Sequence, residues 1–344
     1  MKPARELCTL TTHHRPLATA AIFIYNRCCA DARVGQRGVL DHRLSVWCRQ
    51  VVADKLGRTG GRALTLIRLP AGYYQQFDAD FALPVPGEGY GGWQRADIEI
   101  APEHTALVVM HAYDCGRPEE YPGWHRAVEY IPRAHEISRS VFPPLLTAVR
   151  SSPLAVFHVV GGGAYYQDLP GYQRTVAMAE AEPPLAQVPR DAVRMALDEF
   201  RSEHVFPGNH NRQDIGRGVQ HMDFLPEARP LATEGIAATT AQLYALCRQR
   251  EINHLIYIGF AINWCLLLSP GGMAAMQRHG LLCSTIRQAV TAVENRETTR
   301  EQGAKEIALW RVALAFGFVF DAEGIIAALN GPLGAGDDAA RATT

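Results

Sequence analysis

The sequence predicts an α/β fold, a three-layer α/β/α sandwich built on a mainly parallel, Rossmann-like sheet. The first observation is a series of short apolar runs, each of the length and composition of a buried parallel strand, at residues 105–110, 154–160, 254–258, 281–286 and 318–320. The second is a series of helical stretches between them, at 136–151, 190–204, 239–250, 273–279, 303–316 and 321–330. Strands that alternate with helices favour a parallel sheet covered on both faces.

Turn residues set several boundaries of these elements. Gly161–Gly163 ends the second strand, Gly259 ends the third, and Gly280 caps the helix at 273–279. The three glycines lack the helix start and spacing of a dinucleotide fingerprint. The helix at 190–204 carries Val193, Leu197 and Phe200 on one face, and we expect residues 206–235 to form a long polar loop.

Composition narrows the class of protein. The chain has 344 residues, of which 47% are hydrophobic and 20% charged, with a formal net charge of -1. This balance favours a globular protein and gives no basic surface for nucleic acid or an anionic membrane. No apolar run reaches the roughly 20 residues of a spanning helix. The eight cysteines contain no C-x-x-C pair or zinc spacing, which indicates reduced thiols and a cytoplasmic protein.

Three parts are expected along the chain. Residues 1–98 are irregular and form an N-terminal extension of unknown role that we expect to be partly disordered. Residues 99–330 hold the α/β domain. Residues 331–344 are small and polar, which is typical of a disordered tail.

Cys265 is the most informative single residue. It lies in the segment that leads from the strand at 254–258 into the next helix. Ligands of open α/β sheets bind at the carboxyl ends of the strands, and a helix N-terminus lowers a thiol pKa and offers N–H groups to an oxyanion. Cys265 is therefore a candidate nucleophile, with a buried apolar thiol as the alternative.

The chain resembles the isochorismatase-like cysteine hydrolases, a family that includes nicotinamidases and other amidases. Residues 105–111, 142–158 and 254–292 carry the resemblance, in the order of the family's segments. It implies a small-molecule substrate with an amide-type C–N bond, attack by Cys265 to form a thioester, no cofactor, and a homo-oligomer. It also implies an oxyanion hole at Phe260, Ala261 and Trp264, with a cis peptide bond between Phe260 and Ala261.

The family's Asp and Lys are not matched. His111 stands where the family has its catalytic Asp, and no lysine occurs between Lys55 and Lys305. Imidazole suits a thiol base near neutral pH, so we interpret Cys265 and His111 as a possible dyad. Asp114 either orients His111 or caps a turn. Arg212, Arg217 and Arg229 could replace the lysine's charge, but the sequence favours an ordinary surface loop position for each of them.

Further side chains complete the hypothesis. We expect Tyr113, Trp124 and Asn263 to line a pocket at the strand ends. His210, His221 and Asp223 match no strong ligand spacing, so we expect a solvated loop and no metal. The leading interpretation is a cysteine hydrolase. The alternative is a catalytically altered member that binds a small ligand or a protein partner without turnover.

Overall fold

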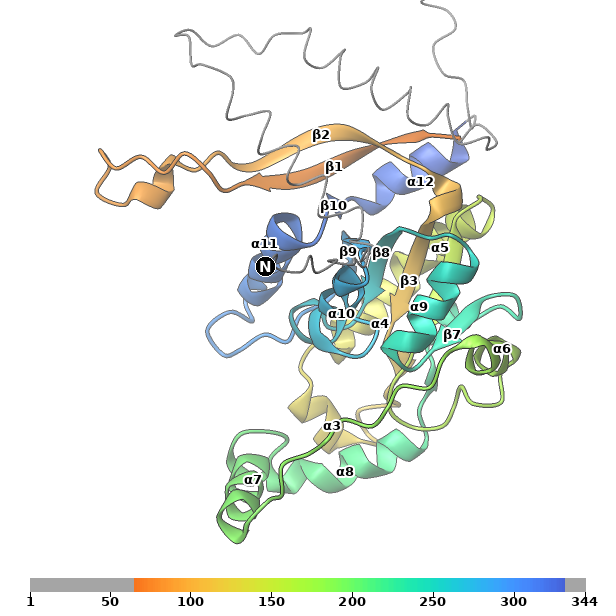
Figure 1. Ribbon diagram of the computed structural model, residues 1–344. Helices are drawn as coiled ribbons and strands as arrows, with labels where there is room; N and C mark the ends of the chain where they lie inside the picture. Colours follow the sequence, from red (N-terminus) through yellow and green to blue (C-terminus); the bar gives the residue numbers. More distant parts are fainter. Residues whose placement is uncertain (1–64, 332–344) are drawn as a thin grey trace, which may run out of the picture. The chain divides into compact units, whose positions relative to one another are not determined.

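The computed structural model describes residues 65–331 (Figure 1). Everything below concerns these residues. The first 64 residues of the expected extension and the expected tail from residue 332 lie outside the described residues. None of the described helices is long and apolar enough to cross a membrane.

An eight-stranded sheet forms the centre of the fold, in the order β2-β1-β10-β9-β8-β3-β5-β7. The neighbours from β10 to β7 are all parallel, and β1 pairs antiparallel with both β10 and β2. The predicted α/β fold is therefore confirmed. The strands are β1 (Ile67–Gln75), β2 (Gly92–Ile100), β3 (Thr105–Met110), β5 (Ala155–Val159), β7 (Gly235–Ala237), β8 (His254–Gly259), β9 (Leu282–Val290) and β10 (Val319–Phe320).

Helices cover both faces of the sheet (Figure 1). On one face, α4 (Ile131–Ser140), α5 (Phe142–Arg150) and α12 (Ala322–Asn330) pack over a core that includes Leu107 and Val109 of β3. On the other, α9 (Thr240–Gln249), α10 (Met273–Arg278) and α11 (Gly303–Ala315) pack over Val108 and Met110. Successive residues of β3 thus enter opposite cores, which explains why this strand is a continuous apolar run.

The remaining elements extend this framework. A second sheet pairs β4 (Tyr113–Asp114) with β6 (Asp223–Phe224). The other α-helices are α3 (Pro122–Ala127), α6 (Pro170–Met178), α7 (Ala192–His204) and α8 (Asn209–Gln220). Three short 3-10 helices within residues 65–331 are η1 (Pro86–Gly89), η2 (Pro102–His104) and η3 (Pro226–Ala228). The element η4 (Ile262–Leu266) is a π-helix. The apolar face predicted for α7 is exposed, with Val193, Leu197 and Phe200 each more than half accessible.

Two predictions about chain organisation need correction. The boundary placed at residue 98 falls inside β2, because β1 and β2 form a hairpin that joins the sheet beside β10. Residues 206–235 are not a long loop, since α8 forms there. Its polar sequence does not predict a helix, and α8 packs closely against α3: a Cβ at Gly218 would lie 2.2 Å from Trp124.

Candidate active site

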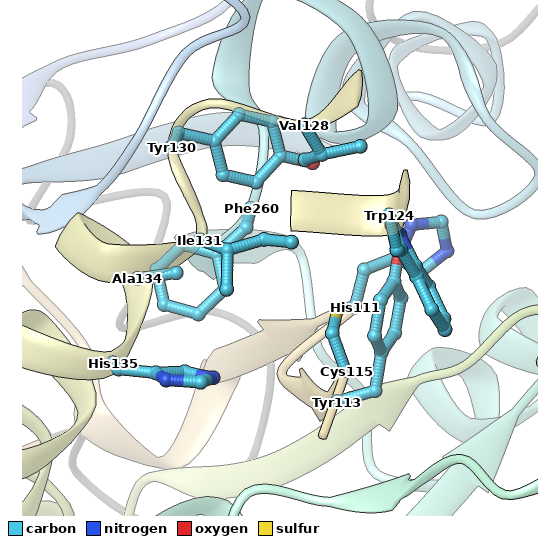
Figure 2. Close-up of a pocket in the computed structure, with 10 residues that line it drawn as sticks. All are labelled: His111, Tyr113, Cys115, Trp124, Val128, Tyr130, Ile131, Ala134, His135 and Phe260. Carbon is cyan, nitrogen blue, oxygen red and sulfur yellow. The ribbon is translucent and has the colours of Figure 1, made fainter. Parts of the chain in front are cut away.

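A small cavity lies at the carboxyl ends of β3 and β8. Figure 2 shows His111, Tyr113 and Trp124 on one wall of the cavity, with residues of α4 on the other. The lining residues are His111, Tyr113, Cys115, Trp124, Val128, Tyr130, Ile131, Ala134, His135 and Phe260. The cavity volume is about 20 Å³, which is room for one water molecule. Tyr113 and Trp124, which the sequence analysis expects near the strand ends, are among these residues.

Cys265 lies on η4, just beyond the turn that follows β8. It is partly exposed, whereas Cys115, Cys247 and Cys283 are buried. Burial raises the pKa of Cys247 and of Cys283 to about 12, and that of Cys115 further still. Among the described thiols, Cys265 is therefore the one that a reagent or substrate can reach. β8 and β3 are parallel neighbours in register, so Cys265 and His111 follow strand ends at the same edge.

The backbone of the turn before Cys265 is closely fitted to β3. Gly259 has a φ of 122°, and a Cβ there would lie 1.9 Å from the Met110 carbonyl oxygen, so only glycine fits. The Phe260 N–H donates to the same carbonyl at 3.1 Å. The bond between Phe260 and Ala261 is cis, as the resemblance implied.

Not every N–H group of the predicted oxyanion hole is free. The Trp264 N–H donates to the Ala261 carbonyl at 3.3 Å, and its side chain is 55% exposed. The Phe260 N–H is used by β3, as described above. Ala261 is thus the one member of the predicted set whose N–H has no acceptor within residues 65–331.

His111 occupies the first position beyond β3. Its backbone N–H donates to the Val159 carbonyl of β5 at 2.9 Å, and its φ of 54° is left-handed. The ring lies against Gly161, where a Cβ would come within 3.1 Å of Nε2. Burial lowers the pKa of His111 to about 4, so the imidazole is neutral at pH 7. A neutral imidazole can accept a proton, but with this pKa it is a weak base for an ordinary thiol, whose pKa is about 8.5.

Asp114 does not orient His111. Its Oδ1 accepts the Gly116 N–H at 2.8 Å, which is the turn-capping arrangement of aspartate. The same oxygen lies 3.8 Å from Nε2 of His135, a buried nitrogen without a hydrogen-bond partner in the described part of the chain. The turn-cap interpretation of Asp114 therefore agrees with the structure, and the orienting role does not.

The three candidate arginines are engaged in other contacts. Each pairs with a carboxylate and none lines the cavity: Arg212 with Glu199, Arg217 with Asp214, and Arg229 with Asp223. Asn263 is also a correction, because its side chain both donates to and accepts from the Val293 backbone, at 2.8 and 2.9 Å. It holds η4 to the segment after β9 instead of lining the cavity.

Two phenols of the cavity lie near the thiol. Burial is the main cause of the raised pKa of Tyr130, and negative charge on Cys265 is the next. Burial also raises the pKa of Tyr113, to which Cys265 contributes a smaller share. Both phenols are therefore neutral hydrogen-bond donors at pH 7. Sequence reasoning missed Tyr130, because it precedes α4 in a segment without periodicity.

The expected absence of a metal concerned His210, His221 and Asp223. Nδ1 of His221 is bonded to the Arg217 carbonyl oxygen at 2.9 Å, and Asp223 is paired with Arg229. Within residues 65–331, no three His, Cys, Asp or Glu side chains converge in a way that could hold a metal ion.

No family model matches the chain, and no curated protein matches it significantly. Solved structures with a similar fold include a cysteine hydrolase from Pseudomonas syringae pv. phaseolicola 1448A, at 15% identity over 67% of this chain and 94% of that chain, with a TM-score of 0.40. An isochorismatase-like hydrolase from Alkaliphilus metalliredigens is 14% identical over 65% and 97% of the two chains, with a TM-score of 0.38. A nicotinamidase from Staphylococcus aureus is 12% identical over 63% and 97%, with a TM-score of 0.30. These values transfer neither an activity nor a substrate to this chain.

Proposed function

We propose that this protein is an isochorismatase-like cysteine hydrolase that cleaves an amide-type C–N bond of a small molecule. The observation that carries the proposal is the position of Cys265. It is a partly exposed thiol at the carboxyl end of the central strands, near the phenols of Tyr113 and Tyr130 in a cavity that two imidazoles also line. Small-molecule sites of open α/β sheets occupy this edge.

In the proposed reaction, Cys265 Sγ attacks the carbonyl carbon of the amide. The thiol proton passes to the imidazole of His111 and from there to the leaving nitrogen as the C–N bond breaks. Water then attacks the thioester, which releases the acid and returns the proton to the thiol. Because the pKa of His111 is low, proton transfer must accompany formation of the C–S bond instead of preceding it.

Neutral donors take the place of the family's lysine in this proposal. The Ala261 N–H and the hydroxyl groups of Tyr113 and Tyr130 are suited to donate to the oxyanion. Hydrogen-bond donors in a dry site stabilise developing negative charge without carrying a formal charge. In this proposal the bound substrate displaces water from the cavity, which strengthens such donors.

A second candidate function is binding without turnover. Two observations favour it: the cavity holds no more than one water molecule, and the only imidazole at the end of β3 has a pKa of about 4. In that case the same strand ends recognise a small ligand or a partner, and Cys265 is a contact residue.

Substitution of Cys265 separates the two functions. The full chain is tested against a panel of small primary amides and N-carbamoyl compounds, and ammonia release is measured. If the protein is a hydrolase, Cys265→Ala lowers turnover about 10⁴-fold or more, as expected for a nucleophile. Cys283→Ala, which alters a buried thiol, serves as the matched control and keeps the rate. A hydrolysed substrate whose turnover survives Cys265→Ala contradicts the thioester mechanism.

A further inference from the structure

The two ends of the central sheet are built differently. β7, at one end, has three residues, and α6 packs beside it so closely that a Cβ at Gly171 would lie 2.3 Å from the Glu234 carbonyl oxygen. β2, at the other end, has nine residues, and no strand among residues 65–331 pairs with its outer side. Short, covered edges are the usual protection against sheet extension, and within residues 65–331 β2 has neither feature.

The outer edge of β2 offers a row of backbone donors and acceptors to another strand. All nine residues of β2 pair with β1 on the inner side, from Gly92 opposite Gln75 to Ile100 opposite Ile67. Backbone groups alternate in direction along a strand, so about half of those in β2 point outward. An edge of this length is the part of a sheet to which a further strand adds.

The charges of β2 favour one kind of added strand. Arg95 and Asp97 lie two apart, so their side chains share one face of the sheet, and both are exposed. Arg95 forms an ion pair with Asp321 at 2.9 Å but remains 75% accessible. No ion pair engages Asp97 within the described part of the chain. Side chains directly opposite in antiparallel strands attract when their charges differ and repel when they match.

We propose that β2 pairs antiparallel with β2 of a second copy of this chain, around a two-fold axis at Ala96. This register sets each Ala96 opposite its counterpart and each Arg95 opposite an Asp97, which gives two opposite-charge pairs and no like-charge pair. A register shifted by two residues in either direction sets Asp97 opposite Asp97 or Arg95 opposite Arg95. The pairing is isologous, as in most two-fold dimers, and joins two sheets through their open edges.

Charge reversal tests the register. We expect the full chain to have twice its 37.8 kDa mass in light scattering coupled to size exclusion. Asp97→Arg sets arginine opposite Arg95 twice and should weaken the dimer at least about tenfold in sedimentation equilibrium. Adding Arg95→Asp to Asp97→Arg restores the opposite charges and should recover dimerisation. Glu88→Arg makes the same charge change in η1, outside β2, and should leave the dimer intact.

Cross-linking tests the same contact by a gain of signal. With Ala96→Cys, the new thiols face each other across the axis, and mild oxidation should give a covalent dimer with a 96–96 disulfide in peptide mapping. Gln94→Cys lies on the same face of β2 but opposite Ile98, so it should give no 94–94 disulfide. A monomeric wild type, a dimer that tolerates Asp97→Arg, or equal cross-linking of the two cysteine variants would overturn the proposal.

Discussion

The turn after β8 and the end of β3 form the two halves of the candidate site, and they differ in the chemical groups that they provide. The turn has Gly259, a cis bond between Phe260 and Ala261, and Cys265 near the end of the short helix η4. The end of β3 has His111, a partly buried and neutral imidazole, where the family resemblance calls for an aspartate. One half thus presents an accessible thiol, and the other presents a neutral imidazole in place of a carboxylate.

The two halves depend on different kinds of contact. The backbone of the turn is fixed by packing, because Gly259 lies against the Met110 carbonyl and Asn263 is bonded to Val293. The activating group depends on a single side chain, which can change without disturbing the sheet. Whether the protein is a hydrolase or a binding protein therefore depends on His111 more than on the fold.

Among substitutions at the end of β3, replacement of His111 is expected to have the largest effect on turnover. If the protein is a hydrolase, His111→Ala should lower turnover about 10²- to 10⁴-fold, the range for loss of a general base. His111→Asp, which places a carboxylate at this position as a base, should recover part of that rate. Turnover is measured with the best amide from the panel described above.

The result also reports on the alternative function. If His111→Ala keeps full turnover, the imidazole takes no part in the mechanism, and Cys265 acts without it. Tyr113→Phe provides a matched comparison, since it removes one hydroxyl from the same cavity wall while keeping the ring.

A pH series distinguishes the site histidine from a structural one. Burial lowers the pKa of His254, at the start of β8, to about 4, and an unfolded histidine titrates near 6.5. Between these values the unfolded chain binds more protons, so the free energy of unfolding should fall by about 3 kcal/mol as the pH drops from 6.5 to 4. Urea unfolding of wild type and His254→Asn checks this, and the variant should lose that part of the slope.

Activity should follow a different acid limb from stability. If neutral His111 is the proton acceptor, kcat/KM should not change with His111 protonation above about pH 5. It should fall as the pH passes about 4, where His111 takes up a proton. A loss of activity centred near pH 6.5, in protein that remains folded, would contradict the buried environment of His111.

The smallest effect is expected from the arginines. Arg217 donates to Asp214 and to the Glu120 carbonyl, and it lies outside the residues that line the cavity. Exposed ion pairs contribute about 0–1 kcal/mol to stability. Because Arg217 does not line the cavity, Arg217→Ala should change turnover less than about twofold. A hundredfold loss in a folded variant would bring this arginine back as the substitute for the lysine.

The central strands could be predicted from sequence because they are buried on both faces, which makes each a continuous apolar run. β1 and β2 are harder to predict from the sequence. β1 contains Pro70 and Gly72, and β2 carries Arg95, Asp97 and Glu99, so neither has the composition of a buried strand. Their place in the sheet follows from pairing between segments.

The site was predicted in outline only. Cys265 and His111 follow strands, so strand prediction places both at one edge of the sheet. Tyr130, His135 and the turn-capping bond of Asp114 depend on how α4 and the segment after β3 fold back over that edge. Such contacts have no local sequence pattern, which is why Asn263 and the arginines were assigned to the site and Tyr130 was not.

Thiol mapping tests the central claim most directly. Wild-type protein is treated with iodoacetamide near neutral pH, and the labelled cysteines are followed over time by mass spectrometry. The structure predicts that Cys265 is alkylated at least about tenfold faster than Cys115, Cys247 and Cys283, because those three are buried and the pKa of each is raised. Labelling of the three buried thiols ahead of Cys265, in folded protein, would contradict its assignment as the nucleophile.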